Sequence, residues 1–165
     1  MYRTVIAMLL ALMVAMPVHA QEAAAAPAQS DGEKIEAKMS KFTDDLQALE
    51  ADAVAKALTL NAEEASAFWP QFKAYQAEQR KIADGQIAAV KKYADHFSTL
   101  TDAEAVAYIQ ALLERDQQVH DLRGKYLSLY AKSIGSRKAA TVIHLSRKLG
   151  FQSQARLSEV IPLVQ

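Results

Sequence analysis

Two related stretches of sequence, about forty residues apart, each carry a helix-start signal followed by an aromatic residue. They read Leu60-Asn61-Ala62-Glu63-Glu64 and Leu100-Thr101-Asp102-Ala103-Glu104. In both, Asn or Thr is followed three residues later by Glu, which is the pattern of a capping box. The cap side chain bonds the amide of the Glu, and the Glu side chain returns to the cap amide. The sequence therefore predicts long helices joined by two related turns, with the motif formed by Leu60, Asn61, Glu64, Leu100, Thr101 and Glu104.

The first twenty residues have the pattern of a cleaved secretory signal peptide. Arg3 precedes an apolar run from Val5 to Met16, and Val18-His19-Ala20 offers a cleavage site. The run is short for a membrane span. Residues 21–31 are rich in Ala, Pro and Gln and predict a flexible linker. The prediction is thus a single helical domain over residues 32–165 in the periplasm of a Gram-negative bacterium.

Apolar residues recur every three or four positions through the rest of the chain, which predicts an all-α fold. We expect helices over about 32–58, 62–97, 102–134 and 137–149, and a last helix-like segment over 154–164. Asp31 is the expected first cap, Pro70 is expected to kink or briefly break the second helix, and Gly150 is expected to end the fourth. Gly135 with Ser136 signals a turn.

The expected buried faces are narrow seams along long helices. Gln79 and Gln86 occupy stripe positions in residues 62–97, where apolar residues would be usual. The middle two helices would each be about 50 Å long at 1.5 Å per residue. We therefore expect an elongated hairpin with flanking N- and C-terminal helices that pairs into a homodimer, and the apolar tail 160–164 is expected to dock on the body or on a second subunit. The seam of residues 32–58 comprises Ile35, Met39, Phe42, Leu46, Leu49 and Ala53, and that of residues 102–134 comprises Val106, Ile109, Leu113, Val119, Leu122, Tyr126, Leu129 and Ile134.

The two pentapeptides resemble the Leu-Thr-x-x-Gln repeats of the Spy/CpxP group of small helical periplasmic proteins. Both copies here end in Glu rather than Gln, and the first has Asn61 in place of Thr. The resemblance implies a cradle-shaped coiled-coil-like dimer that holds unfolded clients as an ATP-independent chaperone in envelope stress. It equally implies a regulator that binds a periplasmic sensor domain.

Charge is divided unevenly along the chain. Residues 122–158 contain eight basic residues and no acidic one, whereas residues 21–121 contain 18 acidic and 10 basic residues. The basic stretch predicts either internal or intersubunit pairing with the acidic first helix, or a surface for acidic clients or an anionic membrane. The candidate client-binding residues are Arg123, Lys125, Arg137, Lys138, Arg147 and Lys148, with Phe68, Trp69 and Phe72 as apolar neighbours.

Trp69 carries two interpretations of its own. It is either a large core residue at a helix corner or an exposed aromatic for a partner, and the usual burial of Trp favours the core. His96, His120 and His144 are far apart in sequence and no Cys is present, so partly solvated histidines are favoured over a metal site. No catalytic, nucleotide-binding, cofactor or nucleic-acid motif was found. The predicted function is client binding, with sensor regulation and a metal response as alternatives.

Overall fold

The computed structural model describes residues 30–164, so the predicted signal peptide and most of the predicted linker lie outside the described residues. The described chain contains four α-helices, one short 3-10 turn and no strand, which confirms the all-α prediction. Their bounds are α1 Asp31–Ala57, α2 Ala62–Asp95, η1 Phe97–Thr99, α3 Asp102–Ile134 and α4 Ser136–Val160.

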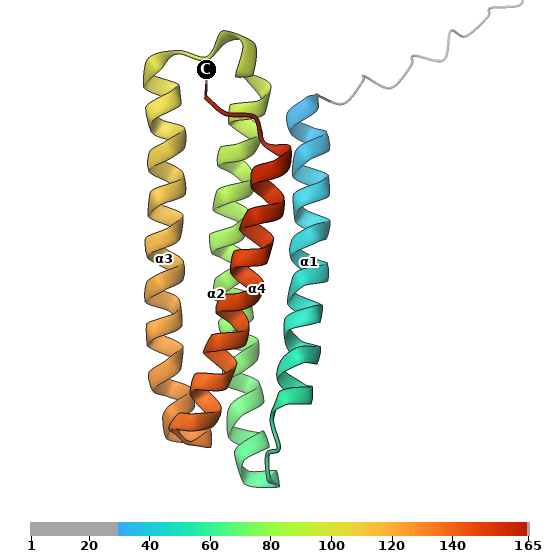
Figure 1. The fold of residues 1–165 in the computed structure, drawn as a ribbon, viewed down its shortest axis with the longest axis vertical. Helices are drawn as coiled ribbons and strands as arrows, with labels where there is room; N and C mark the ends of the chain where they lie inside the picture. Colours follow the sequence, from blue (N-terminus) through green and yellow to red (C-terminus); the bar gives the residue numbers. More distant parts are fainter. Residues whose placement is uncertain (1–29, 165) are drawn as a thin grey trace, which may run out of the picture.

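The helices run up and down and close into a four-helix bundle (Figure 1). α2 packs against both α1 and α3, and α4 packs against both α3 and α1. α4 does not run parallel to α3 along its whole length. It starts beside the end of α3 and crosses towards the start of α1 (Figure 1). This crossing leaves the first half of α3 supported mainly by α2.

Reciprocal capping boxes begin three of the helices. Asn61 Oδ1 accepts from the Glu64 amide at 2.9 Å, and Glu64 accepts from the Asn61 amide at 3.0 Å. Thr101 and Glu104 repeat the arrangement at the start of α3, so both predicted motifs are confirmed as caps. The predicted cap Asp31 is wrong, because Ser30 takes that position and completes a third box with Glu33.

Neither a break at Pro70 nor a helix end at Gly150 occurs. α2 runs through Pro70, although proline removes one helical hydrogen bond, and buried aromatic side chains on either side anchor it to α3. α4 runs through Gly150 as far as Val160, so the predicted fourth helix and last segment are one helix. The predicted turn at Gly135 is confirmed, since this residue has a φ of 82°, which glycine adopts without strain.

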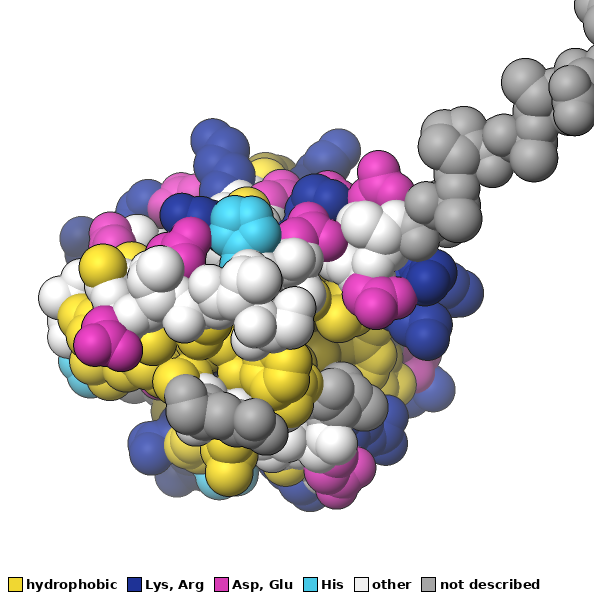
Figure 2. Space-filling model, turned by 90° about the horizontal axis from the view of Figure 1, so that it is seen from above, with side chains coloured by type: hydrophobic (Ala, Val, Ile, Leu, Met, Phe, Trp, Pro, Cys, Tyr) yellow, Lys and Arg dark blue, Asp and Glu magenta, His cyan; other side chains and the backbone are white. Residues whose placement is uncertain are grey.

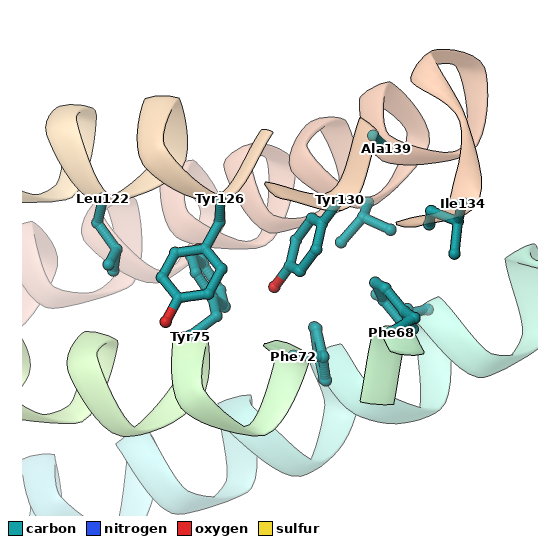
Figure 3. Packing of buried hydrophobic residues seen from close by; sticks show 10 residues of the cluster. Phe68, Phe72, Tyr75, Leu122, Tyr126, Tyr130, Ile134 and Ala139 are labelled. Carbon is teal, nitrogen blue, oxygen red and sulfur yellow. The ribbon is translucent and has the colours of Figure 1, made fainter. Parts of the chain in front are cut away.

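Two apolar clusters occupy opposite halves of the bundle. The larger is aromatic and places Phe68, Phe72 and Tyr75 of α2 against Tyr126 and Tyr130 of α3 (Figure 3). Edge-to-face pairs within it, such as Phe68 with Tyr130 at 5.0 Å between ring centroids, add to burial of apolar area. The smaller cluster contains Met39, Ile87 and Val90.

The tail after α4 packs in part on the body. Ile161 packs against the smaller cluster, and the Tyr93 hydroxyl donates to the Pro162 carbonyl at 3.0 Å. Leu163 remains exposed. Figure 2 shows hydrophobic side chains gathered at this end of the bundle, with charged side chains around its circumference.

Candidate functional site

Two of the three apolar residues assigned to the client surface are buried, and the third is partly exposed. Phe68 is 0% exposed and Phe72 is 2% exposed, so both belong to the aromatic cluster and their assignment to client contacts is wrong for this fold. Trp69 is 36% exposed and touches both neighbours edge-on. The preference for a buried Trp69 is therefore wrong, because the α2 face that carries it turns towards solvent.

The six basic candidates divide into three groups. Lys125 pairs with Glu78 and Lys138 pairs with Glu64, each at 2.7 Å, so the basic stretch neutralises α2 rather than the acidic α1. Arg123 turns inwards and donates to the Ser146 carbonyl at 3.3 Å. The remaining basic candidates are exposed and have no carboxylate within 4.0 Å among the described residues; they are Arg137, Arg147 and Lys148.

A hollow of about 700 Å³ lies between the middle of α3 and α4. Phe151 is 62% exposed on its α4 side, and Leu127 is exposed on its α3 side. The guanidinium of Arg147 lies 5.2 Å from the centroid of the Phe151 ring, a cation–π contact that places positive charge beside apolar surface. This hollow therefore combines the two kinds of group that bind an amphipathic partner.

The hollow continues towards the first half of α3. A second hollow of about 270 Å³ shares Arg115, Asp116 and Gln154 with it and reaches the tail. Next to it, Val106, Ile109 and Leu113 form an exposed stripe, with Leu113 64% exposed. The two hollows and this stripe are called the α3–α4 groove below.

The predicted burial of this stripe is wrong, because α4 crosses away from α3 at this point (Figure 1). The sequence shows the helical period of Val106, Ile109 and Leu113, but this period does not indicate whether a partner helix covers the stripe. Phe151 was missed because the fourth helix was expected to end at Gly150, whereas α4 continues to Val160.

A buried polar layer separates the two apolar clusters. Glu50 of α1 is 2% exposed, and the Tyr75 and Ser146 hydroxyls are hydrogen-bonded beside it. Gln47 and Gln76 exchange side-chain-to-backbone bonds of 2.7 and 2.8 Å. Buried polar groups are tolerated when they are bonded in this way, and they position α1 on α2.

Burial raises the pKa of Glu50, and hydrogen bonds from Ser146 and Gln79 together with the charge of Arg123 partly oppose that rise. The predicted seam of residues 32–58 is wrong at Leu49, which is exposed, whereas the neighbouring Glu50 and Val54 are buried. The signal was Gln79 and Gln86 in the α2 stripe, because polar residues at seam positions require polar partners.

The histidines make no shared site. His96 bonds Glu104 at 3.1 Å, while His120 and His144 are exposed. Hydrogen bonds from the Thr101 amide and hydroxyl, and then from His96, lower the pKa of Glu104 to about 2. In residues 30–164, no group of three His, Cys, Asp or Glu is placed to hold a metal ion.

None of the described helices combines the length and the apolar character needed to cross a membrane. No family model, no curated protein and no solved structure matches this chain.

Proposed function

We propose that this protein is an exported, ATP-independent chaperone-like binder that holds partly folded chains in the α3–α4 groove. The observation that supports it is that the exposed stripe of Val106, Ile109 and Leu113 lies at one end of the groove, and Phe151 and the exposed Arg147 line its larger hollow. Contiguous exposed apolar surface rimmed by charge is typical of interaction sites. Such a groove takes a segment that is apolar on one side and acidic on the other.

Capture proceeds in two stages. Arg137, Arg147 and Lys148, which have no ion pair within residues 30–164, attract acidic segments over a Debye length of about 8 Å at physiological ionic strength. Apolar side chains of the client then cover the stripe on α3 and Phe151. From Val106 to Leu127 the groove follows α3 for roughly 30 Å, enough for several turns of a bound helix. An open, shallow groove holds clients weakly, which suits release without ATP.

Periplasmic location and homodimerisation are parts of the same proposal. They rest on the N-terminal sequence pattern, on the Spy/CpxP resemblance of the two capping motifs, and on the exposed apolar groove, which a second subunit would partly cover. Charge argues for a client rather than a second copy inside the groove itself, because a symmetric pairing would bring the basic faces of two subunits together.

The test compares aggregation of two unrelated, acidic, heat-labile proteins with and without this protein. The triple variant Ile109→Ser, Leu113→Ser, Phe151→Ser is expected to lose at least fivefold in suppression at an unchanged melting temperature, because all three side chains are exposed. Leu49→Ser is the matched control, since Leu49 is an exposed leucine on α1 outside the groove. Equal suppression by the triple variant would overturn the groove assignment.

The same assay distinguishes the chaperone-like function from the alternative function, which is regulation through one sensor domain. A regulator is expected to bind one partner and to show no suppression with either generic client. Loss of client suppression when Arg147 and Lys148 are replaced by Glu would support charge-steered capture. An unmodified protein without any suppression at stoichiometric amounts would overturn the chaperone proposal.

A further inference from the structure

A further hollow, here called the α1–α4 slot, lies between the first half of α1 and the last turns of α4. Its volume is about 490 Å³, within the range of roughly 300–1,000 Å³ that small-molecule sites occupy. Of the described residues that line it, only Leu157 and Ile161 also line the α3–α4 groove, so the slot is a different surface, on the side of α4 that faces α1. Its apolar lining residues are Ile35, Met39, Phe42, Leu157 and Ile161.

The apolar floor of the slot is open because the tail after α4 turns away from α1. Met39, Leu157 and Ile161 belong to the smaller apolar cluster, whose outer side forms the floor. The Tyr93 hydroxyl of α2 holds the Pro162 carbonyl at 3.0 Å, and this bond draws the tail across α2 (Figure 1). Within residues 30–164, the floor between α1 and α4 therefore has no cover.

Two exposed cations stand on opposite walls of the slot. Lys38 of α1 and Arg156 of α4 both line it. They are the sequence neighbours of Met39 and Leu157, which pack in one cluster, so the two cations lie at the same level. Neither forms an ion pair within residues 30–164, and no described residue that lines the slot is acidic.

The acidic residues close to the slot in sequence do not neutralise these two cations. Glu36 pairs with Lys91 at 3.5 Å, and Asp45 pairs with Lys41 at 2.8 Å. Glu159 is exposed on α4 and does not line the slot. The slot thus carries two positive charges without a compensating negative one, and charge complementarity selects a ligand with an anionic head.

The rest of the lining selects an alkyl chain for the other end of the ligand. No lining side chain offers an oxygen acceptor, so an extended peptide would leave its backbone N–H groups unbonded there. An alkyl chain has no polar group to satisfy, and the flexible side chain of Met39 adapts to its shape. From Ile35 to Phe42 the floor follows α1 for roughly 10 Å at 1.5 Å per residue, which suits a chain of medium length.

We propose that the α1–α4 slot binds a single-chain anionic amphiphile such as a medium-chain fatty acid. The carboxylate head accepts hydrogen bonds from the Lys38 ammonium and the Arg156 guanidinium, and the alkyl chain lies on Met39, Phe42 and Leu157. Lysine and arginine lay their stems on apolar surface and keep their charged ends in water, which places the head at the mouth of the slot. The site needs no client and is independent of the proposed function.

The methyl group of Met39 allows binding to be measured inside the slot. Met39 is the only methionine after position 16, and its NMR signal in the full chain is assigned by its loss in Met39→Leu. Sodium decanoate, kept below the concentration at which it forms micelles, is expected to shift this signal saturably with a Kd on the order of 0.1 mM. Octanoate is expected to bind several-fold more weakly, since each buried methylene group contributes up to about fourfold in affinity.

Control ligands separate the head from the chain. Decyltrimethylammonium has the same chain with a cationic head, and acetate has the head without the chain; both are expected to leave the Met39 signal unshifted at the same concentrations. No saturable shift with decanoate, or an equal shift with the cationic amphiphile, would overturn the proposal. Binding to phosphatidylglycerol vesicles without binding of monomeric decanoate would also overturn it, because the surface would then recognise a bilayer. A Met39 signal that moves with protein concentration alone would show that a second copy covers the slot, with the same consequence.

Paired variants test the two cations. Lys38→Gln combined with Arg156→Gln is expected to weaken decanoate binding at least tenfold at an unchanged melting temperature, because both side chains are exposed. Arg147→Gln combined with Lys148→Gln is the matched control, since it removes two exposed cations of α4 that do not line the slot, and it is expected to leave the affinity unchanged. Unchanged affinity in the first variant, or equal losses in both, would overturn the site.

Discussion

The guanidinium of Arg123 occupies the space that a side chain at position 150 would need. A Cβ built on Gly150 would lie 2.5 Å from Arg123 Nη2, closer than van der Waals contact allows. The same guanidinium is held by the Ser146 carbonyl, so it cannot move aside without losing that bond. This contact between α3 and α4 explains a glycine in the interior of a helix.

Gly150→Ala is therefore expected to behave differently from other glycine replacements in the helices. Gly85→Ala and Gly124→Ala meet no atom within 4 Å and are expected to stabilise the fold by roughly 0.5–1 kcal/mol each through helix propensity. Gly150→Ala is expected to give no gain or a net loss of about 1 kcal/mol. Urea unfolding of the three variants measures these changes in the free energy of unfolding. An equal gain in stability at all three positions would contradict the close contact between position 150 and Arg123.

Two tyrosines of the aromatic cluster are expected to respond in opposite directions to loss of the hydroxyl. Tyr130 is fully buried and its hydroxyl has no partner among the described residues, so Tyr130→Phe is expected to stabilise by about 1 kcal/mol. The Tyr126 hydroxyl donates to Glu78 at 2.8 Å, so Tyr126→Phe is expected to destabilise by about 1 kcal/mol. Thermal unfolding of both variants checks the sign, and destabilisation by Tyr130→Phe would reveal a bonded hydroxyl.

The buried Glu50 carboxyl is expected to make stability depend on pH. Its pKa is raised from 4.5 in the fold, where it faces Tyr75 of α2, Arg123 of α3 and the neutral Ser146 of α4. A carboxyl with a raised folded pKa stabilises the fold fully below its unfolded pKa, and the contribution is lost as the pH rises through the folded pKa. The free energy of unfolding is therefore expected to decrease as the pH rises above about 4.5.

Glu50→Gln is expected to flatten that pH dependence and to exceed the unmodified protein in stability at pH 7, because the amide carries no charge to bury. Glu63→Gln, at an exposed position of α2, serves as the control and is expected to leave the profile unchanged. A loss of stability in Glu50→Gln at pH 7 would show that the Arg123 charge outweighs burial and that the sign is reversed.

The two capping boxes predicted from sequence are expected to contribute independently. Asn61→Ala and Thr101→Ala should each lower the free energy of unfolding by about 1 kcal/mol. The effects should add, because the two helix starts lie at opposite ends of the bundle (Figure 1). Ser98→Ala, an exposed serine near the second cap, is the control. Denaturant titration of the single and double variants would expose any coupling as a departure from the sum.

Charge reversal is expected to separate structural from free basic residues on α4. Lys138→Glu places a carboxylate beside Glu64 in a partly buried pair and is expected to lower the melting temperature, more so at low salt. Lys148→Glu alters an exposed residue without a partner in the described chain and is expected to leave the melting temperature unchanged. Equal melting temperatures for the two variants would mean that the Lys138 pair contributes nothing to the fold.

Local chemistry determined the parts of the structure that were predicted from sequence. The helix starts at Asn61 and Thr101 and the turn at Gly135 depend on groups only a few residues apart. They can therefore be predicted from the sequence alone. The all-α class followed from the apolar period. Of the basic candidates on α4, Arg137, Arg147 and Lys148 are exposed and Lys138 pairs with Glu64 of α2, a difference that the sequence does not show.

Only the tertiary structure decided which faces are covered. The period of Val106, Ile109 and Leu113 is the same whether or not a helix lies on it, and the crossing of α4 leaves this stripe exposed. The buried face of α1 differs from the predicted seam by one position, so that Glu50 is buried and Leu49 is exposed. These outcomes depend on contacts between residues far apart in sequence, whose free energy is a property of the assembled bundle and not of any one helix.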